Sequence, residues 1–173
     1  MTTGAKGSTG RMGKTAQRVL LAALVMGLAS ARPAYADATL FVGANTSPAN
    51  RVTRGFAIGA GLLIVGFEFE YADTTDDPTA QAPALRVGTG NLLIQTPFAI
   101  KGIQPYFETG GGFYRETLGV HEDSGFTAGT GGGAKISLAG PIRLRIDYRV
   151  MKLGSGALVS PAHRIYAGLN LKF

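Results

Sequence analysis

Residues 142–150 of the chain read IRLRIDYRV, and its last ten residues, 164–173, read RIYAGLNLKF. In both stretches an apolar side chain occupies every second position, and in the first the intervening positions hold three arginines and one aspartate. Successive side chains of a β-strand point to opposite faces, so a period of two predicts two strands, each with an apolar face. A wall with lipid on one side and polar groups on the other would suit such strands.

The first 36 residues have the features of a secretory signal peptide. Four basic residues and no acidic ones precede an apolar run of 13 residues at 19–31 (VLLAALVMGLASA). A membrane-spanning helix needs about 20 apolar residues, so this shorter run suits the hydrophobic region of a signal peptide. Ala34 and Ala36 flank Tyr35 as an A-x-A site. We therefore expect cleavage before Asp37, with a cut after Ala31 as the alternative, and a single domain at residues 37–173.

Without this segment the chain is nearly neutral. Of 17 basic and 11 acidic residues, five basic and no acidic ones precede position 37, which leaves a net charge of +1 for residues 37–173. Nucleic-acid binding would need a basic stripe in this part, and its basic residues alternate with acids instead, so we predict no nucleic-acid partner. The chain has no cysteine, which excludes disulfides, a lipoprotein anchor and thiolate metal sites.

Eight segments of residues 37–173 are predicted as strands. They span residues 39–44, 56–62, 65–72, 85–96, 103–114, 126–138, 142–150 and 164–173. Short connections, near residue 63 and at 97–102 and 139–141, alternate with longer polar ones at 45–53, 73–84, 116–124 and 153–161. The facing of the first strand stays open. In the fourth, Leu85 and Val87 share one face whereas Leu92 and Ile94 share the other, so we expect a β-bulge at 88–91.

An even strand number, alternating short turns and long loops, and both chain ends on one side are typical of outer-membrane barrels. In this pattern, and most closely at residues 131–150 and 164–173, the chain resembles the small eight-stranded outer-membrane β-barrel proteins of the OmpA-transmembrane and OmpX type. The resemblance implies an all-β, eight-stranded antiparallel up-and-down transmembrane barrel in the cell outer membrane. We predict a structural or surface-display (adhesion) role, with no enzymatic activity and no cofactor.

The end of the chain resembles the signal by which the barrel-assembly machinery selects its clients. This signal is a terminal Phe173 preceded at alternate positions by Leu171, Leu169 and Ala167. The resemblance implies outer-membrane lipid, periplasmic chaperones and the assembly machinery as partners, and a monomeric barrel. Any external ligand would bind the loops at 73–84 and 116–124, and their sequences do not identify it.

The polar faces of the strands would fill the interior of the barrel. An eight-stranded barrel is just wide enough for side chains to fill, and buried charges need partners, so we predict a plug of salt bridges rather than an open pore. The predicted lumen ion-pair network comprises Glu68, Glu70, Glu108, Lys135, Arg143, Arg145, Asp147, Arg149 and Arg164. Basic residues outnumber acidic ones in this set, so we expect an anion or trapped water to complete it.

Three other interpretations remain open: a narrow-pore channel, a lipid-modifying barrel enzyme, and a soluble periplasmic lipocalin-like barrel with its apolar faces inward. The lipid A deacylases place a serine two residues from a histidine, whereas Ile165 stands two residues after His163. His121, in an acidic segment, is expected to be a solvated loop residue. Gly129 to Lys135 (GTGGGAK) lacks the Gly-Lys-Ser/Thr and helix of a phosphate-binding loop.

Overall fold

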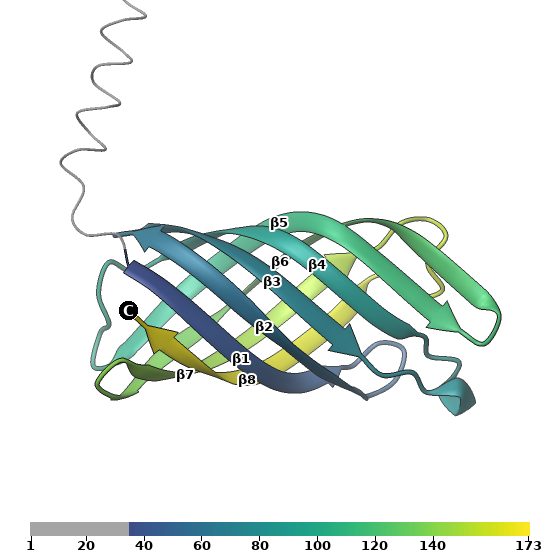
Figure 1. The fold of residues 1–173 in the computed structure, drawn as a ribbon, viewed down its shortest axis with the longest axis horizontal. Helices are drawn as coiled ribbons and strands as arrows, with labels where there is room; N and C mark the ends of the chain where they lie inside the picture. The colour runs from purple at the N-terminus through teal and green to yellow at the C-terminus, as the bar shows by residue number, and fades with distance from the viewer. Residues whose placement is uncertain (1–34) are drawn as a thin grey trace, which may run out of the picture. The chain divides into compact units, whose positions relative to one another are not determined.

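The computed structural model describes residues 35–173, so the predicted signal peptide, including Ala34, falls outside the described part except for Tyr35 and Ala36. The described residues form a closed antiparallel barrel in which each strand pairs with its neighbours in sequence and β1 pairs with β8 (Figure 1). The strands are β1 (Tyr35–Asn45), β2 (Arg51–Leu62), β3 (Val65–Thr74), β4 (Ala84–Gln95), β5 (Ile103–Leu118), β6 (His121–Ala139), β7 (Ile142–Lys152) and β8 (Ala162–Lys172). The predicted fold class, with eight strands in up-and-down order, is confirmed.

Closure of the barrel leaves no unpaired edge strand among the described residues and separates an outer face from an interior. Each strand pairs with a neighbour on both sides, although residues 121–127 of β6 pair with β5 alone, and the start of β1 and the end of β8 lie at the left of Figure 1. The side chains then alternate between wall and interior. Phe69 is 53% exposed on the outer face, whereas its neighbour Glu70 is 1% exposed inside. Within the described residues no helix is long and apolar enough to cross a membrane.

The predicted bulge in β4 is wrong. β4 pairs in unbroken register with both β3 and β5, and its odd-numbered residues face inward from Leu85 to Gln95. Leu85 and Val87 are buried because they belong to an apolar cluster inside the lumen, on the side toward the loops. Around them pack Tyr114, Met151, Leu153 and Ala162. The register shift lies instead between β6 and β7, at Ser137 and Ala139.

The third predicted loop, at 116–124, is also wrong. β5 continues to Leu118 and β6 begins at His121, so the two strands form a long hairpin with only Gly119 and Val120 at its tip. Gly119 has φ of 59°, the left-handed conformation that a tight turn requires. This segment is polar because the hairpin extends past the end of β7, where residues 121–127 of β6 pair with β5 alone.

The second polar connection is ordered by a short 3-10 helix, η1 (Pro78–Ala80). Asp77 caps this helix, because its carboxylate accepts hydrogen bonds from the backbone N–H groups of Thr79 and Ala80. The Thr79 hydroxyl and these backbone groups favour the charged carboxylate and lower the pKa of Asp77 below its usual value. A second anchor is the buried Arg51, whose guanidinium donates to the backbone carbonyls of Ser47 and Pro83 and so joins two connections.

Candidate functional site

Arg145 of β7 is the centre of the charge cluster inside the barrel. Its side chain is fully buried, and its two terminal nitrogens donate to Glu68 on β3 at 2.5 and 3.0 Å. The same guanidinium reaches Glu108 on β5 at 3.3 Å, and its Nε donates to the Tyr106 hydroxyl at 2.7 Å. Tyr106 in turn donates to Asp147. One arginine therefore joins three strands across the lumen.

Two further arginines meet on Glu70, on the side of Arg145 toward the loops. Arg149 donates to Glu70 at 2.9 Å and also to Glu108, while Arg164 of β8 binds the same Glu70 oxygen. The Tyr166 hydroxyl donates to the other oxygen of Glu70 at 3.2 Å. This carboxylate thus receives donors from both β7 and β8.

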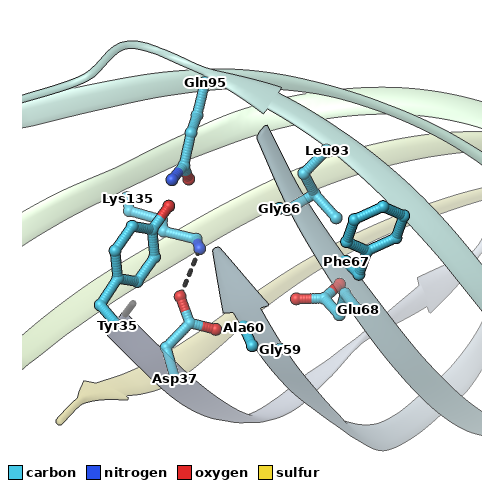
Figure 2. A pocket seen from close by; sticks show the side chains of 10 residues that line it. All are labelled: Tyr35, Asp37, Gly59, Ala60, Gly66, Phe67, Glu68, Leu93, Gln95 and Lys135. Atoms are coloured by element: carbon cyan, nitrogen blue, oxygen red, sulfur yellow. Dashed lines mark hydrogen bonds and ion pairs between the residues drawn. The ribbon is translucent and has the colours of Figure 1, made fainter. Parts of the chain in front are cut away.

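Toward the short turns, Lys135 and Arg143 share Asp37 of β1. Lys135 Nζ lies 2.6 Å, and Arg143 Nη2 lies 3.0 Å, from the same oxygen of Asp37. Arg143 also donates to Gln104 at 3.1 Å and to Asn170 at 2.8 Å. Figure 2 shows the Lys135 ammonium pointing at the Asp37 carboxylate.

The structure places all nine sequence-predicted lumen residues in the interior, each at most 6% exposed, and in contact with a partner of opposite charge. Sequence reasoning missed Asp37. It was assigned to the start of the mature chain, ahead of the first predicted strand, whereas β1 begins at Tyr35 and directs Asp37 inward. With Asp37 the cluster holds five acidic and five basic side chains, so the expected anion is not needed to balance its charge.

A small cavity lies beside the Asp37–Lys135 pair. A cavity of about 10 Å³ near the short turns is lined by Tyr35, Asp37, Glu68, Gln95 and Lys135, among others (Figure 2). Such a volume corresponds to roughly one water molecule. Inward glycines on β6 allow this packing: a Cβ at Gly133 would overlap the Tyr106 hydroxyl and the backbone of β7. The close packing of β6 against β7 thus brings the paired charges of opposite strands within contact distance across the lumen.

The residues assigned to the assembly signal lie on the outer face of β8. Leu169, Leu171 and Phe173 are exposed, as is Ala167. The backbone of Phe173 exchanges two hydrogen bonds of 2.9 Å with Ala36, which closes the barrel at its end. Ala36 therefore pairs within the sheet, and the predicted cut after it would remove this pairing.

If the exposed Phe173 ring serves recognition, Phe173→Ala should lower the amount of protein assembled in cells several-fold. Its stability after refolding into lipid vesicles should change by less than about 0.5 kcal/mol, because a lone exposed side chain contributes little. Quantitative gel analysis of folded protein in membranes, beside urea unfolding in vesicles, checks both parts. A matched control is Phe98→Ala, at a similarly exposed ring in a short turn. Equal assembly of the two variants would contradict the assignment.

The remaining candidate residues do not converge. Ser160 exchanges hydrogen bonds with the backbone of Leu153, while His163 pairs with the Tyr148 hydroxyl at 2.7 Å on the outer face. His121, predicted as a solvated loop residue, is the first residue of β6 near the tip of the hairpin, and its ring lies 3.2 Å from the carboxylate of the buried Glu116. Lys135, the last residue of the glycine-rich segment, lies within β6, four residues before the strand ends, and binds Asp37.

Comparisons with protein-family models and with curated protein sequences gave no match. Solved structures are similar in fold. The Neisserial surface protein A structure aligns at a TM-score of 0.64 and 16% identity, covering 83% of this chain and 99% of that one. The N-terminal barrel domain of Pseudomonas aeruginosa OprF aligns at 0.60 and 14%, covering 80% and 97%. Ail, the attachment invasion locus protein of Yersinia pestis, aligns at 0.50 and 11%, covering 81% and 98%. The chain thus has the fold of the small eight-stranded outer-membrane β-barrels.

Proposed function

We propose that this protein spans the outer membrane as a monomeric barrel with a lumen sealed by side chains, and that it serves a structural or surface-display role. The observation that carries this proposal is the separation of side chains by the wall. Apolar groups such as Phe67, Phe69 and Leu169 are exposed outside, and ten paired charges lie inside. A contiguous apolar surface of this extent is stable in lipid and would aggregate in water.

Charged residues follow the apolar part of the outward face near the loop end of the wall. On β2 the outward residues run from Leu62 through Phe56 to Arg54, and on β3 they run from Val65 through Tyr71 to Asp73. An apolar band with a charged border matches hydrocarbon bounded by headgroups. The inverted alternative, a soluble lipocalin-like barrel, would need these apolar residues inside.

Sealing of the lumen has two layers. The ion-pair network fills the middle, and the apolar cluster around Leu85, Tyr114 and Met151 lies between it and the loops. An ion crossing the barrel would have to disrupt both layers, which favours a plug over the narrow-pore alternative. Catalysis is not part of the proposal, since Ser160 and His163 each bond elsewhere. Display of the β5–β6 hairpin, with Val120 fully exposed at its tip, supports a surface role.

Planar-bilayer recording tests the seal. The refolded protein should give no steady channels, because the interior of an eight-stranded barrel is just wide enough for side chains to fill and the charged side chains here pair across it. A heat-denatured sample and a detergent blank serve as controls for leakage. Steady openings of one reproducible size, present only with folded protein, would contradict the sealed lumen and favour the channel.

A further inference from the structure

We propose that Arg86 and Arg115 form a site for the phosphate group of an anionic outer-leaflet lipid, with one acyl chain of that lipid lying in the groove beneath them. The inference rests on the proposed membrane location. The proposed function requires only that lipid surrounds the wall, whereas this inference names one class of lipid that binds at one place on it.

The first observation is a pair of like charges in direct opposition. Arg86 on β4 and Arg115 on β5 are register partners on the outward face, and their side chains are 65% and 56% exposed. Like charges directly opposite each other on a sheet destabilise it. An anion bound between the two guanidinium groups would remove this repulsion, and guanidinium groups match phosphate in geometry.

The neighbouring carboxylates leave part of this charge uncompensated. Asp73 lies 3.2 Å from Arg86 but is shared with Arg54 at 3.8 Å, and Glu122 pairs with Arg115 at 2.6 Å. Three guanidinium groups thus face two carboxylates along this border. Exposed ion pairs are worth little, so a phosphate can compete for the arginines.

The second observation is that the arginine pair lies on the loop side of an open groove in the wall. The next outward residues after Arg86 on β4, toward the short turns, are Gly88 and Gly90, and no heavy atom outside the adjacent residues lies within 4 Å of the place that a Cβ would take at either glycine. From Gly90 toward the short turns, a groove in the wall is lined by Phe67, Phe69, Gly90, Leu92 and Thr109, among others. A lipid with its phosphate at the arginines would direct an acyl chain along the apolar wall into this groove, which gives the site both a polar and an apolar part.

The test compares phosphorylated and dephosphorylated lipid. The protein is refolded in phosphatidylcholine vesicles, transferred to a zwitterionic detergent, and titrated with diphosphoryl lipid A or with its dephosphorylated form while native mass spectrometry measures the bound fraction. The wild type should prefer the phosphorylated lipid. The double variant R86Q/R115Q should bind it about tenfold more weakly, the scale expected for two exposed charge contacts. The control K101Q/K152Q removes the same charge, from a short turn and from β7, and should bind as the wild type does.

The outcomes separate the two proposals. Failure of the wild type to float with the vesicles would overturn the membrane location itself. Flotation with equal binding of both lipids, or equal weakening by both double variants, would overturn the lipid site alone. Inorganic phosphate at the concentration of the lipid should not displace it; full displacement would show a site for free phosphate and overturn the assignment to lipid.

Discussion

Replacing Arg145 by alanine is expected to lower the free energy of unfolding by about 3–5 kcal/mol, the cost of leaving buried charges without their partner. Arg145 is the shared partner of Glu68, Glu108 and Asp147, all of them buried. Urea unfolding of the protein in lipid vesicles, followed by circular dichroism, measures the change. Arg54→Ala is the matched control, because that side chain is 76% exposed, and it should change stability by at most about 1 kcal/mol.

A double variant separates the loss of the charge pair from the loss of packing. Arg145→Met keeps much of the side-chain volume but leaves Glu68 unpaired, whereas Arg145→Met combined with Glu68→Gln removes both charges of the closest pair. The double variant should therefore be more stable than Arg145→Met alone. If Arg145→Ala and Arg54→Ala were equally mild, the interior cluster would not contribute to stability as described.

The alternation of side chains was sufficient to predict the barrel. In a barrel strand every second residue faces lipid and the others face the lumen, so apolar and polar residues alternate along the sequence. In β7 the inward residues Arg143, Arg145, Asp147 and Arg149 could be assigned from the sequence alone. The same rule failed in β4. There Leu85 and Val87 face inward and pack in an apolar cluster of the lumen, so a facing assigned from hydrophobicity alone was reversed for these two residues.

The partners inside the lumen could not be predicted from the sequence. Arg145 and Glu68 are 77 residues apart, and they meet only because the strand register brings β7 and β3 to the same level on opposite sides of the barrel. Asp37 was missed for a different reason: it was predicted to be the first residue after the cleavage site, and the first strand was predicted to begin at residue 39, whereas β1 begins at Tyr35. Its ion pairs with Lys135 and Arg143 depend on closure of β1 against β8, which no local pattern records.

The orientation of the wall is tested by Phe69→Arg. Phe69 lies midway along the outward face of β3, with Phe67 and Tyr71 on either side, and its ring contacts Phe56 at a centroid distance of 6.3 Å. A cation at the bilayer midplane of a barrel costs about 2–4 kcal/mol, and the cost falls to about 0–1 kcal/mol near the interface. Urea unfolding in vesicles should therefore show that Phe69→Arg lowers the free energy of unfolding by the amount expected at the midplane, about 2–4 kcal/mol.

Val52→Arg is the matched control for this change. Val52 is 58% exposed and Phe69 53%, so the two positions differ in depth rather than in burial by protein. Val52 lies beyond Arg54 on the outward face of β2, at the level of water and headgroups in the proposed orientation. Phe69→Arg should therefore be more destabilising than Val52→Arg in vesicles. A barrel that stood in water would tolerate an arginine at either exposed position, so equal and small losses would contradict lipid contact along the wall.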